Sequence, residues 1–244
     1  MKSIFKTLSI VIVVTGISVN IIAQEGEIFV SLAAGASIPL SEYAASDFNN
    51  PSSGFAKTGG NFGINFGYRF NEYLSLTGLL SGSVNRYDYI QLQNWLTENF
   101  IDLMPDTRWI VETKSWGLGG LLGGFTGSLP LVNNRFYVDA RALGGFTYVY
   151  SPAIYITGIE SGAEDIYLFV EQYSTGSWAL DFGAGFRYKR TRNQYFTLYA
   201  DYFMAHPKYS GVVSESNFGA SRSDSFSQKI NAVNISLGIG YIVN

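Results

Sequence analysis

Large apolar residues alternate with small or polar residues along most of the chain. The clearest stretch is the C-terminus, where one parity consists of Val233, Ile235, Leu237, Ile239, Tyr241 and Val243. The other parity consists of Asn234, Ser236, Gly238, Gly240 and Ile242. Because successive side chains of a strand point to opposite faces, this pattern predicts a strand with one large apolar face and one small or polar face. A strand between lipid and a narrow interior has that contrast.

The same alternation predicts eight strands. They cover residues 28–38, 61–70, 74–87, 112–126, 136–150, 178–189, 196–204 and 233–243, and the parity of the glycine-rich 112–126 segment is ambiguous. The connections are short near 71–72, 130–134 and 191–193, and long at 39–58, 88–111, 151–175 and 209–228. This strict alternation predicts an all-β fold, an eight-stranded antiparallel transmembrane β-barrel with short periplasmic turns and long extracellular loops.

The N-terminus has the pattern of a secretory signal peptide. Lys2 and Lys6 are followed by an apolar run at 8–14, and Ala23 offers a small residue for cleavage. The run is shorter than the roughly 18 apolar residues of a membrane-spanning helix. We therefore expect a signal peptide at residues 1–23 and a barrel at residues 24–244, which is a length suited to one domain.

Composition agrees with a sheet that faces a bilayer. Charged residues are 14% and aromatic residues 16% of the chain. A soluble barrel or sandwich would expose a polar face with far more Lys and Glu than these strands carry. Outward aromatic side chains are expected in belts at the two membrane interfaces. The predicted interface residues are Tyr68, Phe70, Phe186, Tyr188 and Tyr241 near the periplasmic rim, and Trp116, Tyr148 and Trp178 near the outer rim.

Seven charged residues lie on the inward parity of four of these strands. They are Arg69, Asp139, Arg141, Asp181, Arg187, Lys189 and Asp201. An eight-stranded barrel has an interior that side chains about fill, and an isolated buried ion is costly. We therefore expect a network of paired charges that plugs the lumen. The alternative is a narrow, gated polar path.

The segment 88–111 has apolar residues at helical spacing. They are Leu92, Trp95, Leu96, Phe100, Leu103 and Met104, and Pro105 is expected to end the helix. This helix would cap the barrel mouth or lie on the outer leaflet, or it would form a docking surface for a partner or ligand. The segments 151–175 and 209–228 are polar and are expected to be solvated loops.

Residues for chemistry are scarce. The chain has no cysteine and one histidine, His206 at a strand end, so thiol nucleophiles are excluded and zinc sites are not expected. A net charge of -3 lacks the basic footprint of a nucleic-acid-binding protein. We expect no cofactor, no metal and no catalytic residue.

Several short motifs resemble a known family. The ending Ala23-Gln24 resembles the signal peptides of Bacteroidota exported proteins. The run 35–40, followed by Tyr43, and the run 56–59 resemble the first two strands of the outer-membrane β-barrel domain family, which includes small OmpA/OmpX-like barrels. Gly238, Tyr241 and Val243 resemble the barrel-assembly signal, although the chain ends in Asn244 rather than an aromatic residue. The resemblance implies an eight-stranded barrel in a bacterial outer membrane and no single activity.

These observations favour a non-enzymatic outer-membrane protein with a structural or interaction role through its extracellular loops. The expected partners are outer-membrane lipid and lipopolysaccharide, the barrel-assembly machinery and a protein of the cell envelope, with no nucleic acid. Two alternatives stay open. One is a narrow channel for small or hydrophobic solutes, and the other is a lipid-modifying outer-membrane enzyme.

Overall fold

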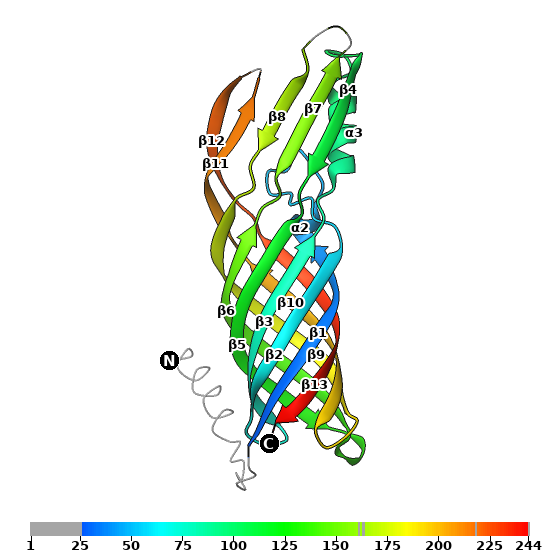
Figure 1. The fold of residues 1–244 in the computed structure, drawn as a ribbon, viewed down its shortest axis with the longest axis vertical. Coiled ribbons are helices and arrows are strands. Elements are labelled where there is room, and N and C mark those ends of the chain that lie inside the picture. The colour runs from blue at the N-terminus through cyan, green and yellow to red at the C-terminus, as the bar shows by residue number, and fades with distance from the viewer. Residues whose placement is uncertain (1–25, 161, 163, 218, 244) are drawn as a thin grey trace, which may run out of the picture.

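Eight long strands form a closed antiparallel barrel (Figure 1). The computed structural model describes residues 26–160, 162, 164–217 and 219–243, so the predicted signal peptide at 1–23 lies outside the described residues. The barrel strands are β1 (Glu27–Leu40), β2 (Gly59–Arg69), β3 (Leu74–Asn85), β5 (Trp116–Pro130), β6 (Phe136–Tyr150), β9 (Ser174–Lys189), β10 (Gln194–Ala205) and β13 (Ile230–Val243). Their order is β1-β13-β10-β9-β6-β5-β3-β2, and β2 pairs back to β1. The predicted eight-stranded antiparallel barrel is confirmed.

The alternation in the sequence sets which face of each strand points outward. On β2, Phe62 is 57% exposed on the outside, whereas Asn65 and Arg69 are buried inside. On β13, Leu237 is 68% exposed and Ser236 is buried. Apolar side chains therefore cover the outside of the barrel, and polar side chains occupy much of its interior, which is the inverse of a soluble protein.

One end of the barrel has three short connections. They are residues 70–73, 131–135 with a 3-10 helix (Val132–Asn134), and 190–193. We call this end the turn end and the opposite one the loop end. The strand expected at 136–150 has those bounds, and most others differ by a few residues at an end.

At the loop end the long connections form a second sheet rather than solvated loops. Its strands are β4 (Thr107–Thr113), β7 (Ile154–Glu160), β8 (Ile166–Val170), β11 (Lys208–Ser216) and β12 (Gly219–Ser227). They pair in the order β12-β11-β8-β7-β4 and rise above the barrel (Figure 1). The expectation of loops at 151–175 and 209–228 is wrong. Each segment forms a hairpin, β7–β8 and β11–β12, and the two hairpins are joined by pairing of β8 with β11.

The prediction of a single strand at 112–126 is also wrong. Residues 107–113 form β4, which pairs with β7 in the second sheet, whereas β5 begins at Trp116 and pairs with β3 and β6 in the barrel. The chain changes sheet at residues 114–115. There the backbone N–H of Lys114 donates to the carbonyl of Ala153 at 2.9 Å.

Helical spacing at 88–111 correctly indicates a helix, α3 (Tyr89–Phe100). Instead of capping the barrel mouth or lying on the outer leaflet, α3 packs against the second sheet beside β4 (Figure 1). We call the second sheet together with α3 the loop head. None of the helices among the described residues is both long and apolar enough to cross a bilayer.

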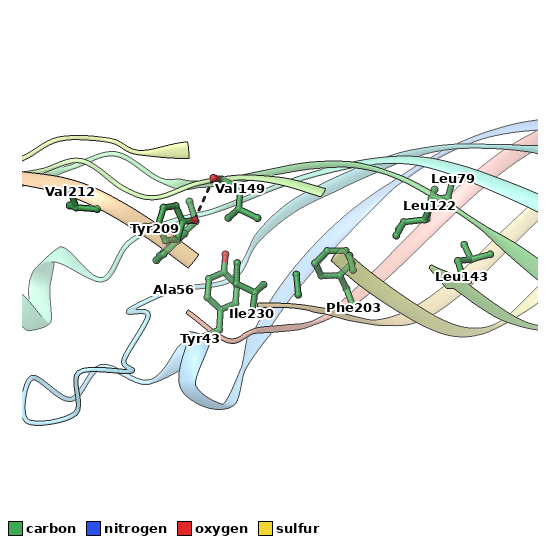
Figure 2. Close-up of a cluster of buried hydrophobic side chains, with 13 residues drawn as sticks. Tyr43, Ala56, Leu79, Leu122, Leu143, Val149, Phe203, Tyr209, Val212 and Ile230 are labelled. Atoms are coloured by element: carbon green, nitrogen blue, oxygen red, sulfur yellow. Dashed lines mark hydrogen bonds between the residues drawn. The ribbon is translucent and has the colours of Figure 1, made fainter. Parts of the chain in front are cut away.

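A continuous apolar core joins the barrel to the loop head. Leu79, Leu122, Leu143 and Phe203 fill the barrel interior, and the short helix α2 (Ser41–Ala44) adds Tyr43, which is fully buried at the loop end (Figure 2). Tyr209 of β11 completes this cluster, and its hydroxyl donates to the carbonyl of Val149. The core closes the loop end with side chains from both sheets.

Candidate functional site

The lumen of the barrel contains two buried ion-pair clusters, and the first is centred on Arg141 of β6. Its Nε donates to Oδ1 of Asp201 on β10 at 2.8 Å and lies 3.6 Å from Oδ1 of Asp181 on β9. Its Nη1 donates to Oδ1 of Asn65 on β2 at 2.7 Å. One guanidinium therefore links strands on opposite sides of the barrel and neutralises one of two neighbouring carboxylates.

The second cluster is centred on Arg187 of β9. Its Nε and Nη2 donate to the two carboxylate oxygens of Asp139 at 3.0 and 3.1 Å, and Nη2 also donates to Oγ of Ser128 at 2.9 Å. The hydroxyl of Tyr199 donates to the same carboxylate at 2.8 Å. A two-pronged arginine–carboxylate pair of this kind combines charge with fixed geometry.

Aromatic rings join the two clusters. The guanidinium carbon of Arg141 lies 4.6 Å from the ring centroid of Tyr199, whose hydroxyl belongs to the second cluster. The guanidinium of Arg187 lies 4.4 Å from the ring of Tyr137. Since a cation over a ring face is attracted to it, these rings hold the two arginines in place inside the lumen.

The remaining two predicted charges lie nearer the turn end. Arg69 pairs with Glu27 at the start of β1, and Lys189 Nζ lies 5.3 Å from the ring of Tyr137. These residues line a cavity of about 190 Å³ at the turn end, together with Glu72. The sequence pattern does not point to Glu27, because that residue precedes the expected start of its strand.

Glycines on the inner face make room for the large lumen side chains. A side chain at Gly183 would collide with the carboxylate of Asp201, and one at Gly240 would collide with the ring of Tyr195. The glycine-rich inner parity therefore accommodates arginines and tyrosines within a small barrel.

Two small voids lie beside the clusters in the described part of the lumen. Their volumes are about 40 and 30 Å³, and Asn65 and Arg141 line both. Spaces of this size hold one or a few water molecules. The lumen is filled with side chains at the level of Arg141.

We expect the purified protein to give no stable conductance in planar lipid bilayers, because paired side chains fill the lumen at two levels. The matched test is a variant in which Arg141, Asp181 and Asp201 are all changed to alanine. These three residues line the void of about 40 Å³, which the substitutions would enlarge. Brief, small current steps are expected from that variant alone. Steady large channels from the unaltered protein would contradict a plugged lumen.

Seven of the eight predicted interface aromatic residues point toward the outer surface. Tyr68, Phe70, Tyr148, Trp178, Phe186 and Tyr241 are exposed, and Tyr188 is half-buried against Phe136, with ring centroids 4.8 Å apart. The most exposed of them is Trp178, at 79%. Their position on the apolar surface agrees with side chains that meet lipid headgroups.

Trp116 does not point outward, so the prediction of a membrane-interface residue at this position is wrong. It is 3% exposed inside the loop end, and its Nε1 donates to the carbonyl of Gly54 at 2.8 Å. Its ring packs edge-on against Tyr43, with centroids 5.6 Å apart. Because glycines occupy both parities of β5, the sequence does not show that this residue points inward.

The hydroxyl of Tyr43 is buried beside Trp116. Burial, with Tyr209 nearby, raises the pKa of the Tyr43 hydroxyl above its ordinary value, so this group remains a neutral donor to Asn85.

The three residues of the expected assembly signal lie on β13. Tyr241 and Val243 are exposed on the outside, whereas Gly238 faces inward against Thr197. Recognition by an assembly machinery stays a prediction for these residues.

Candidate chemistry is limited among the described residues. His206 is exposed after the end of β10, and in this part of the chain its imidazole makes neither a hydrogen bond to a serine nor an ion pair with a carboxylate. Nor do three or more His, Asp or Glu side chains gather within the described ranges in a way that could hold a metal ion.

Solved structures are similar to this chain, whereas sequence comparisons find no match. No protein-family model matches the chain, and no curated protein matches it in sequence. A major outer membrane protein from Thermus thermophilus is similar in structure, with 13% identity and a TM-score of 0.50 over 90% of this chain and 100% of that one. The match to the outer membrane protein OprG from Pseudomonas aeruginosa has 12% identity and a TM-score of 0.47, and covers 90% of this chain and 96% of that one.

A further match is Ail, the attachment invasion locus protein of Yersinia pestis, with 16% identity and a TM-score of 0.43 over 90% of this chain and 100% of that one. At 13% identity, the likeness to the Thermus thermophilus structure concerns the fold alone. The closed strand order, the apolar exterior and the polar lumen agree with it. The chain therefore has the fold of a small eight-stranded outer-membrane β-barrel.

Proposed function

We propose that this chain is a non-enzymatic integral protein of a bacterial outer membrane that acts through its loop head. Residues 1–23 direct export, and residues 24–244 form the mature protein. The turn end faces the periplasm, and the loop head faces the outside. Short turns on one side and long segments on the other support this orientation. Outward aromatic side chains at both rims, among them Tyr68, Trp178 and Tyr241, support insertion into a membrane.

The loop head carries the interaction role. The observation behind this proposal is that segments from three separate connections pair into one five-stranded sheet, β12-β11-β8-β7-β4. Flexible loops would connect the barrel strands equally well. A sheet with a packed helix, in contrast, presents a fixed surface. A surface held by backbone pairing loses less conformational entropy when it binds, which favours recognition.

The alternative of a narrow channel has less support. Arg141 and Arg187 each hold a carboxylate inside the lumen, and the spaces beside them are about 40 and 30 Å³. A solute would have to separate buried ion pairs in order to pass, which is costly in a medium of low polarity.

The alternative of a lipid-modifying enzyme lacks an assembled site. An acyl hydrolase needs a nucleophile, a base and an orienting acid within hydrogen-bond reach. The imidazole of exposed His206 makes no hydrogen bond or ion pair with such groups among the described side chains, and the hydroxyl of Ser177 accepts the backbone N–H of His206 instead, at 3.3 Å. We propose instead that outer-membrane lipid and lipopolysaccharide are the surroundings of the barrel, and that the assembly machinery recognises Gly238, Tyr241 and Val243.

A headless variant tests the interaction role. Short glycine–serine turns would replace residues 87–114, 152–172 and 207–228, leaving all eight barrel strands. Both proteins would be purified from native outer membranes after mild cross-linking, and their partners identified by mass spectrometry. An envelope protein retained by the full chain and lost from the headless barrel is expected. A partner retained equally by both, or none retained by the full chain, would contradict the proposed role.

A further inference from the structure

We propose that the loop head binds the alkyl chain of a single-chain amphiphile in an apolar cavity between α3 and the second sheet. The cavity has a volume of about 400 Å³ and lies outside the barrel. Its walls come from two layers of the fold. Leu92, Leu96 and Phe100 of α3 line one side, and Trp109, Ile156 and Leu168 of β4, β7 and β8 line the other.

The chemistry of the walls selects an apolar occupant. Each described residue that lines the cavity is apolar, including Trp95, Met104 and Ile166. Ordered water needs two to four polar partners, and the only polar side-chain groups of the lining, the indole N–H groups of Trp95 and Trp109, present no polar surface to the cavity. Dry apolar cavities of this kind take up hydrocarbons. The volume also lies within the roughly 300–1,000 Å³ of small-molecule sites and is too small for a protein helix.

The shape of the cavity favours a linear chain. Leu92, Leu96 and Phe100 are four residues apart on one face of α3, so the helical wall is about 12 Å long. The adaptable side chain of Met104 extends that wall. An alkyl chain would lie along it with its methylene groups against both layers. A charged end group would remain in water outside, because the walls cannot compensate a buried charge.

The walls are held by contacts of their own. Leu92 and Leu96 are buried in one apolar cluster with Trp109, Val111 and Ile156. Phe48, from the segment before β2, stacks on Trp95 with ring centroids 4.9 Å apart. The cavity is therefore formed before a ligand enters, which reduces the conformational entropy lost on binding.

Two tryptophans in the wall provide a direct readout. The full chain would be reconstituted in phospholipid nanodiscs with Trp178→Phe, since Trp178 faces the lipid and would report amphiphile dissolved there. Brominated dodecanoic acid is then titrated, because a bromine atom quenches Trp95 and Trp109 on contact. We expect saturable quenching that unlabelled dodecanoic acid reverses and butyric acid does not. Affinity is expected to rise about fourfold per added methylene group.

Filling the cavity tests whether binding occurs there. Leu168→Phe places a larger side chain in the wall and is expected to weaken binding about tenfold or more. Ile166→Phe is a second filling variant in case the first fails to fold. Ile90→Phe is the matched control, because Ile90 lies on the same helix, is 56% exposed and does not line the cavity. The control is expected to bind as the parent does.

The proposal is overturned if quenching rises linearly without saturation, or if the filling variants and the control bind equally. Folding of every variant is checked by heat-dependent mobility in gels. The outcome is separate from that of the headless variant. Saturable binding in a protein that retains no envelope partner would support the cavity and contradict the proposed partner role.

Discussion

Replacing Arg141 with methionine is expected to lower the free energy of unfolding by about 3–5 kcal/mol, which is typical when one partner of a buried ion pair is removed. Methionine keeps much of the length of the side chain but removes the charge. Asp201 then loses the donor at 2.8 Å, and Asp181 loses the nearest cation. Asn65 also loses the hydrogen bond that links β2 to β6. Reversible urea unfolding in lipid vesicles measures this change.

Restoring neutrality is expected to recover more than half of that loss. In the triple variant Arg141→Met, Asp181→Asn and Asp201→Asn, no carboxylate is left without a counter-ion. Arg190→Met is the matched control, because Arg190 is exposed at the turn end, and it is expected to cost less than about 0.5 kcal/mol. A loss that the triple variant does not recover would show that packing, rather than charge pairing, dominates at this position.

Replacing Trp116 with alanine is expected to cost about 3–5 kcal/mol, the usual range for truncating a buried large aromatic side chain. The ring packs between Tyr43 of α2 and Tyr209 of β11, so its loss opens a cavity where the barrel meets the loop head. Trp116→Phe keeps most of the volume and loses the hydrogen bond to Gly54. It is therefore expected to show an intermediate loss in the same unfolding assay.

Trp178→Ala is the control for that measurement, because Trp178 is the same residue type on the outer surface of the barrel. Its truncation leaves no internal cavity, so the expected loss is smaller than that of Trp116→Ala. Equal losses at the two positions would mean that Trp116 does not hold the junction between the two sheets.

The barrel is predictable from the sequence because each strand meets lipid on one face and a crowded lumen on the other. That contrast is strongest on β2 and β13, where the alternation is regular. It fails on β5, where glycines occupy both parities, and there neither the start of the strand nor the direction of Trp116 could be read. The alternation also placed Asp139, Arg141 and Arg187 inward.

The pairing of those charges and the loop head could not be predicted, for two physical reasons. Which carboxylate meets which arginine depends on the register between strands, and a single strand does not encode it. Ser128, which completes the Arg187 cluster, and Glu27, which pairs with Arg69, lie just beyond the expected strand ends. The head strands β11 and β12 are polar and lack alternation, and β8 pairs with β11 across a long separation in sequence.

Labelling of single cysteines in intact cells tests whether the chain forms a closed outer-membrane barrel with its loop head outside. The chain has no cysteine, so each introduced thiol is unique. Asp102→Cys lies in the exposed turn between α3 and β4 of the loop head, and Arg192→Cys lies in an exposed connection at the turn end. A membrane-impermeant maleimide is expected to label Asp102→Cys in intact cells and Arg192→Cys only after the outer membrane is permeabilised. Labelling of Arg192→Cys in intact cells, with Asp102→Cys protected, would show that the turn end, and not the loop head, faces the outside.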